Sequence, residues 1–298
     1  MLKFFKNFEQ KHLLAQDQTE LDLACFRALY SLLLAWRIYS DLTYLREKFE
    51  MSAYYIPHSF LAFFEANSKP DYNVFLAIEW VLIISLVILA IGVRARFFAG
   101  VACLLFTWSQ LVYYSMHLVP STKYVFHSRN IIVFILLGLA IIPTAPLKDA
   151  MVELRSRSRS RVLYSYVVIL LCFAYSSALV TRILTVPYSW FSGEFLGIYL
   201  AHYGYVAEVP WAQEIALRPY LPMLMSWITS LFELFSWTLL ISGRHRLVII
   251  ALGIVFHVIN RESGFADFVD WFGFAYLIFI PYSKVFNRIK SLFNPSAA

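Results

Sequence analysis

Charged residues are scarce in this 298-residue chain. Asp, Glu, Lys and Arg make up 15% of it, whereas a soluble domain has about 25%. Hydrophobic residues make up 60%, which is more than one or two soluble cores can bury, so a soluble enzyme is disfavoured. The composition also excludes a disordered chain, a collagen-like chain and a coiled coil. A polytopic membrane protein is the class that remains.

Motifs of soluble chemistry are also missing. The three cysteines lie in apolar stretches without CxxC or Cys/His metal spacing, so we expect buried thiols and no metal site. The sequence has no Walker loop, GxGxxG, HExxH or GxSxG motif. Gly193 and Gly197 have the GxxxG spacing of helix dimers, but they lie in a predicted loop. The N-terminus has no continuous apolar segment with a cleavage site, so we expect an uncleaved signal anchor.

Long apolar runs, in contrast, occur throughout the chain. A membrane-spanning helix needs about 17–25 mostly apolar residues. The runs that meet or approach this length are Leu21–Ser40, Val74–Val93, Phe97–Met116, Asn130–Pro146, Val162–Leu184, Tyr220–Ile241, Leu247–Asn260 and Phe268–Ser283. Backbone groups inside lipid must pair within the segment, which favours helices. We therefore predict an all-α bundle of about eight transmembrane helices, forming a single domain over residues 1–298.

The distribution of basic residues predicts the orientation of these spans. With the N-terminus in the cytoplasm, the cytoplasmic segments hold most of the Lys and Arg residues, as the positive-inside rule requires. Both termini are then cytoplasmic, and we expect a bacterial inner membrane protein. We attribute most of the basic surplus behind the net charge of +6 to this topology, so the charge does not indicate an acidic partner. The Arg-Ser tract at 154–161 is interpreted as a stop-transfer loop, so the expected partner is the lipid bilayer and not a nucleic acid. The absence of an internal repeat disfavours a secondary transporter.

Several ionisable residues interrupt the predicted spans. Each costs about 2.5–3.5 kcal/mol to insert, which makes it a functional candidate with an expected partner. They are Arg27, Arg37, Glu79, Arg182, Glu233 and His257. A structural role is the competing interpretation: Arg27 could pair with Glu79 or Glu233, His257 could join two helices, and the arginines near the outer span ends could reach the headgroups.

One group of residues predicts a site at the outer side of the membrane. His127 lies at the outer end of the fourth span, Arg182 lies near that of the fifth, and an aromatic-rich segment at 185–219 follows. Histidine can act as an acid, a base or a donor, and arginine can bind an anion but cannot act as a base. These residues suit an anionic or carbonyl group at the lipid–water boundary. Glu233 and His257, on neighbouring spans, could form a second hydrogen-bonded pair or a proton relay.

Short segments along residues 20–280 resemble one membrane family. They are Phe26-Arg27-Ala28, the turn Ile91–Arg96, His127-Ser128-Arg129-Asn130, Tyr175–Ala178 followed by Arg182, Trp190 and Gly193, and Glu233 followed by Arg244-His-Arg246 and Phe256-His257. Together they resemble the horizontally transferred transmembrane (HTTM) domain family, which shares its membrane domain with vitamin K-dependent gamma-carboxylase. The resemblance implies a helical membrane fold with an outward-facing cavity for an amphiphilic, quinone-like molecule.

The resemblance also implies a departure from the carboxylase reaction. The family's base lysine corresponds to Thr181 or Arg182, and neither can deprotonate a substrate at neutral pH. His127 matches the family's histidine at the cavity mouth and could polarise a carbonyl oxygen. The candidate catalytic residues are therefore His127, Arg182, Glu233 and His257, with the reaction and cofactor unassigned. The alternative is a non-enzymatic membrane accessory factor for the maturation or export of a peptide or protein.

Overall fold

The protein was analysed as a computed structural model. It describes residues 19–51, 69–116, 122–152, 158–206, 208–218, 220–241, 244–262 and 273–293. These residues form helices and turns and contain no β-strand, which confirms the all-α class. They divide into two compact units. The α2 unit lies within Ala15–Val167 and Phe274–Ala298, and the α12 unit lies within Val168–Gly273.

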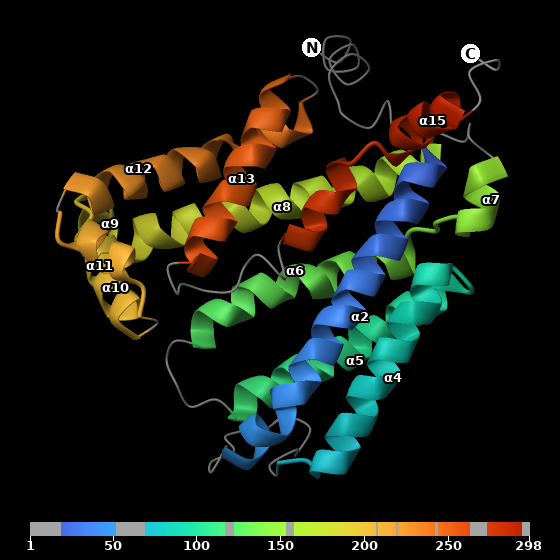
Figure 1. The fold of residues 1–298 in the computed structure, drawn as a ribbon, viewed down its shortest axis with the longest axis horizontal. Coiled ribbons are helices and arrows are strands. Elements are labelled where there is room, and N and C mark those ends of the chain that lie inside the picture. The colour runs from blue at the N-terminus through green and yellow to red at the C-terminus, as the bar shows by residue number, and fades with distance from the viewer. Residues whose placement is uncertain are drawn as a thin grey trace. The chain divides into compact units, whose positions relative to one another are not determined.

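Four long helices of the α2 unit pack in the order of the chain. They are α2 (Glu20–Met51), α4 (Tyr72–Ile91), α5 (Ala95–Met116) and α6 (Thr122–Ile141). Each packs against the next, as Figure 1 shows. The short α7 (Leu147–Val152) and the C-terminal α15 (Tyr282–Phe293) contact α2. The unit also contains the 3₁₀ helix η3 (Gly273–Phe279) and the first part of α8 (Ser158–Thr185).

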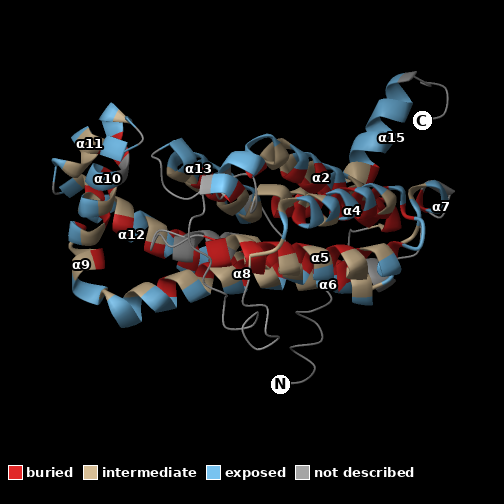
Figure 2. Cartoon of the chain, turned by 90° about the horizontal axis from the view of Figure 1, so that it is seen from below, coloured by how far each residue is buried: buried red, intermediate tan, exposed pale blue. Residues whose placement is uncertain are grey.

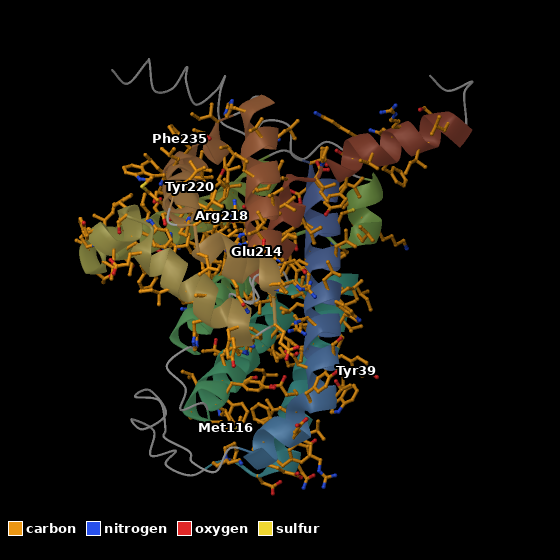
Figure 3. All side chains as sticks on the ribbon, turned by 60° about the vertical axis from the view of Figure 1, so that its left-hand side comes forward. Tyr39, Met116, Glu214, Arg218, Tyr220 and Phe235 are labelled. Atoms are coloured by element: carbon orange, nitrogen blue, oxygen red, sulfur yellow. The ribbon has the colours of Figure 1, made fainter. Side chains whose placement is uncertain are left out.

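Local sequence signals fix the ends of α4. Asp71 caps its N-terminus, because the carboxylate accepts hydrogen bonds from the backbone N–H groups of Asn73 and Val74. Gly92 ends it in the left-handed conformation, with φ of 93°. Figure 2 shows buried residues along α2, α4 and α5. Tyr39 lies on the outer side of α2 in Figure 3 and is exposed, and its ring meets the edge of Trp80.

The α12 unit contains the aromatic segment at 185–219. Its described residues form three short helices, α9 (Pro187–Phe191), α10 (Glu194–Val206) and α11 (Pro210–Ala216), where a loop was expected. Pro187 and Pro210 each occupy a first helical turn, where the missing N–H has no cost. Trp190, Leu196 and Leu200 form a small core under these helices. The unit continues with α12 (Tyr220–Phe235), the 3₁₀ helix η2 (Ser236–Leu240) and α13 (Arg244–Glu262).

Among the described residues, four helices are long and apolar enough to cross a membrane. They are Tyr72–Ile91, Ala95–Tyr113, Val162–Thr185 and Tyr220–Leu240, which match the second, third, fifth and sixth predicted spans. A shorter apolar helix at Arg129–Ile141 lies in the predicted fourth span. The first and seventh predicted spans lie within α2 and α13, and the described end of the eighth contains η3. The structure thus supports a helical membrane protein, whereas the number eight stays a prediction.

Candidate functional site

Two helices of the α12 unit present polar side chains on facing sides. On α8, Cys172, Tyr175 and Arg182 are separated by three and seven residues, so they share one face. On α12, Ser230 and Glu233 are three residues apart and are both buried. This spacing places one row of polar groups from each helix against the other.

An ion pair joins the two rows. Nη1 of Arg182 donates to both carboxylate oxygens of Glu233. The Glu233 side chain is 2% exposed and that of Arg182 is 26% exposed. The Arg182 guanidinium carbon also lies 4.3 Å from the ring centre of Trp190, a cation–π contact. Nε1 of Trp190 donates to Oγ of Ser230 at 2.9 Å, so the three charged or aromatic groups are held by one connected network.

A second polar pair lies between α8 and α13. Oη of Tyr175 and Nε2 of His257 are 2.7 Å apart, and both side chains are buried. Either group can be the donor, depending on the tautomer of the imidazole. The ring of Phe232 packs edge-on against Tyr175 with centroids 4.9 Å apart, and it also contacts Phe256. The pair is therefore enclosed by aromatic rings.

Glu233 and His257, which were predicted as one pair, belong to two neighbouring pairs in the structure. Glu233 binds Arg182, and the hydrogen bond described for His257 is with Tyr175. Phe232 precedes Glu233 and touches Tyr175, so the two polar pairs are neighbours through one turn of α12. The competing interpretation, that Arg182 reaches the headgroups, differs from the structure, which places Arg182 in an ion pair within the protein.

The helix changes its winding directly after Glu233. The α-helical α12 becomes the tighter 3₁₀ helix η2 at Ser236, which alters the carbonyl pairing. Oγ of Ser236 donates to the carbonyl of Glu233 at 2.7 Å, and Sγ of Cys172 lies 3.3 Å from the carbonyl of Ser236. Nε1 of Trp237 donates to Oγ of Ser176. These bonds fix the turn that carries Glu233 against α8.

A tight backbone contact holds the aromatic segment on α12. Gly193, between α9 and α10, has φ of 81°, and a Cβ atom there would lie 2.2 Å from the backbone nitrogen of Met223. A Cβ on Gly197 would lie 3.5 Å from Cγ of Pro222. The GxxxG spacing therefore serves a contact within the chain. It places Trp190, three residues before Gly193, against α12.

His127 lies in α6, but its side chain is outside the described residues. Its convergence with Arg182 stays a prediction. The neighbouring Arg129 is described, and its Nη1 donates to Oε1 of Gln110 at 2.6 Å. Its guanidinium carbon lies 5.7 Å from the ring centre of Tyr113. The end of α6 that carries His127 thus contains a partly buried polar contact with α5.

The other charges in predicted spans have structural partners in the α2 unit. Glu79 accepts a hydrogen bond from Ser109, and Arg37 forms an ion pair with Asp41 at 2.9 Å. Arg27 is fully buried and donates from Nη1 to Oγ1 of Thr144 and to the carbonyl of Ala145, at 2.8 and 2.7 Å. The expected pairing of Arg27 with Glu79 is therefore wrong.

The position of Arg27 explains how it does without a carboxylate. A Cβ atom on Gly92 would lie 2.5 Å from Nη2 of Arg27, so the guanidinium packs on the C-terminal cap of α4. The two acceptors lie just after the C-terminus of α6. Two helix C-termini, each carrying a partial negative charge, face the same cation. These partial charges and the two hydrogen bonds from Nη1 are the compensation that the described residues give to Arg27.

Three members of the network were absent from the sequence-based site. They are Tyr175, Trp190 and Ser230. The serine could have been found, because Ser226, Ser230 and Glu233 recur at helical spacing on one face. The tyrosine and tryptophan lie in segments that carried the family resemblance but had no assigned role. The described residues contain no cluster of His, Cys, Asp and Glu suited to a metal ion.

No protein-family model, curated protein or solved structure matches this chain. The interpretation of the site therefore depends on its own geometry. Its defining feature is a neutralised Arg–Glu pair, stacked on an indole and adjacent to a buried Tyr–His pair. This arrangement can donate hydrogen bonds from a guanidinium without adding net charge to an apolar environment.

Proposed function

We propose that this chain is an HTTM-like integral membrane protein whose α12 unit binds a neutral amphiphile with a carbonyl group, such as a quinone. The proposal includes eight spans, cytoplasmic termini and a bacterial inner membrane location, which the charge distribution of the sequence supports. The four apolar helices support the membrane setting. The family segments around Tyr175, Arg182, Glu233 and His257 coincide with the polar network described above.

The partial exposure of Arg182 is the observation that carries the proposal. Glu233 occupies Nη1, and the Nε and Nη2 donors make no hydrogen bond to a described residue. Because the side chain is 26% exposed, these donors are open to a ligand. The pair has no net charge, so a neutral carbonyl oxygen gains a charge-assisted hydrogen bond without leaving a second charge uncompensated. An anionic ligand would instead compete with Glu233.

The Tyr175–His257 pair is buried next to the Arg182–Glu233 pair in the same unit and supports it from within the protein. Both residues can donate or accept a proton in a hydrogen bond. Phe232 and Phe256 pack around this pair and complete its apolar surroundings. We assign binding to this site and leave the reaction unassigned, since Arg182, at the position of the family's base lysine, cannot act as a base.

Quinone binding can be measured on the full-length protein in nanodiscs. Native mass spectrometry tests for a co-purifying quinone, and a titration with a short-chain naphthoquinone follows quenching of tryptophan fluorescence. Arg182→Gln removes a charge-assisted hydrogen bond worth about 1.5–3 kcal/mol, so we expect affinity to fall about tenfold or more. Arg37→Gln is the matched control, since Arg37 is also ion-paired and 21% exposed but lies in the α2 unit.

Equal affinities for the two variants, or no quinone binding at all, would contradict the proposal. Arg182→Lys is a control for misfolding, because it retains the charge next to Glu233 while removing the planar donor array. We expect its affinity to lie between those of the wild type and Arg182→Gln. A protein that binds no quinone but requires the intact aromatic segment in cells would instead fit the accessory-factor alternative.

A further inference from the structure

The C-terminal helix α15 has no packed apolar face. Its first residues contact α2, but every residue from Lys284 to Leu292 is exposed. Figure 2 shows most of this helix in the colour of exposed residues. The exposed residues include four large hydrophobic side chains, Val285, Phe286, Ile289 and Leu292. An aqueous setting would leave this surface without compensation.

The hydrophobic and basic side chains of α15 lie on different sides of the helix axis. At 100° per residue, the four hydrophobic residues fall within an arc of about 120°. Basic residues flank this arc on both sides: Lys284 and Arg288 on one side, Lys290 on the other. The helix contains no acidic residue. An apolar stripe bordered by long cationic side chains is the pattern of a helix lying in a membrane interface.

Two hydrogen bonds fix the start of α15. The backbone N–H of Ser283 donates to Oδ1 of Asp22 at 2.7 Å, and Oγ of Ser283 donates to Oδ2 at 3.0 Å. Asp22 lies in the first turn of α2, and the same carboxylate accepts from Thr19. The helix α15 therefore begins beside the first turn of α2.

That end of the α2 unit is also basic. Arg27, in the second turn of α2, touches the α4–α5 turn at Gly92 and the segment after α6 at Ala145. The turn carries exposed Arg94 and Arg96, and Lys148 follows Ala145 in the chain. A cluster of basic residues at one end of a set of spans marks the side that faces an anionic leaflet.

We propose that α15 lies in the interface of an anionic leaflet and binds lipid phosphates. Its apolar stripe enters the boundary between headgroups and acyl chains, to a depth of about 5–10 Å. Lys284, Arg288 and Lys290 then reach the phosphate groups on both sides of the helix. A second copy of α15 is a poor occupant, because pairing the stripes would bring basic residues together without any acidic partner. This inference does not depend on the proposed quinone site.

The test uses single labelled positions in the full-length protein. After Cys25, Cys103 and Cys172 are replaced by serine or alanine, an environment-sensitive fluorophore is attached at Ile289→Cys. The matched control, Asn287→Cys, lies on the opposite side of the helix. In nanodiscs of phosphatidylcholine with phosphatidylglycerol, we expect blue-shifted emission and quenching by spin-labelled lipid at position 289 only.

The anionic component is tested with Lys284→Gln/Arg288→Gln/Lys290→Gln. Each cation near an anionic surface contributes about fivefold in binding, so the ratio of bound to free helix should fall on the order of a hundredfold. The label should also lose its blue shift when phosphatidylglycerol is omitted. The unfolding midpoint of Arg288→Gln/Lys290→Gln should stay unchanged, because these two side chains are exposed.

Equal emission at positions 287 and 289, or emission that does not respond to lipid charge, would overturn the proposal. Burial of position 289 that appears in lipid-free detergent and rises with protein concentration would assign the stripe to self-association instead. If the protein binds no quinone but the label on α15 responds to lipid as expected, only the proposed function is rejected. The two proposals therefore fail separately.

Discussion

Replacing Gly193 by alanine should separate the aromatic segment from α12. Two independent features of this position oppose a side chain. The backbone has φ of 81°, and an added Cβ atom would lie 2.2 Å from N and 2.5 Å from Cα of Met223. Both nearby atoms belong to the backbone of α12, so no flexible side chain can move aside. The contact can be relieved only if the junction between α9 and α10 moves away from α12.

The expected cost of Gly193→Ala follows from these two features. The left-handed conformation costs a non-glycine residue about 1–2 kcal/mol. Forcing an extra methyl group into a closed contact costs about 1–3 kcal/mol more. We therefore expect the free energy of unfolding to fall by about 2–5 kcal/mol. Since Trp190 is held by Ser230 across the same junction, its stacking on Arg182 should weaken as well.

Gly100→Ala is a control with the same chemical change. Gly100 lies inside α5, and an added Cβ would be 3.9 Å from Cβ of Ala140, an ordinary contact. Alanine is favoured over glycine within a helix by about 1 kcal/mol, so this variant should be as stable as the wild type or more stable. Reversible unfolding in mixed micelles, followed by tryptophan fluorescence, measures both. A Gly193→Ala variant within about 0.5 kcal/mol of the wild type would mean that the junction accommodates the methyl group without moving away from α12.

Two further predictions concern charges of the α2 unit. Arg27→Met should lower the free energy of unfolding by less than about 1 kcal/mol, because a buried ion is replaced by a hydrophobic side chain of similar length. Arg27→Ala leaves a cavity and should cost about 2–5 kcal/mol in the same assay, and equal effects of the two variants would contradict this. Asp22→Ala removes the acceptor for Ser283, so hydrogen exchange of the Ser283 amide should accelerate strongly. Unchanged exchange there would show that α15 is held by other contacts.

The membrane-spanning helices could be predicted from sequence because their signal is local. An apolar run such as Tyr72–Ile91 must pair its backbone within itself wherever the rest of the chain lies. Four of the predicted spans therefore recur as long apolar helices. The aromatic segment was harder, since its aromatic content favoured an interfacial loop. Pro187 and Pro210 are signals of helix starts, and they would have indicated α9 and α11.

The partners of the charged residues could not be predicted in the same way. Arg182 and Glu233 were singled out as charges within predicted spans that need a partner, and they pair with each other although they are 51 residues apart. Which helices lie side by side depends on packing along the whole chain, and spacing within one helix does not reveal it. Arg27 presents a different difficulty, which is the chemical type of its partners. Its partners are a threonine hydroxyl and a backbone carbonyl, and a search for carboxylates cannot find them.

The contacts of Arg27 have a consequence for synthesis of the chain. Its acceptor Thr144 follows 117 residues later, so a ribosome working at about 5–20 residues per second needs roughly 6–23 s to supply it. In the predicted arrangement α2 spans the membrane, and during that delay it carries an uncompensated cation that the surrounding lipid would penalise. We therefore expect α2 to stay with the insertion machinery until α6 has been made. Stalled nascent chains ending before Thr144 should crosslink to the translocon through α2, and chains that extend well past Ala145 should not.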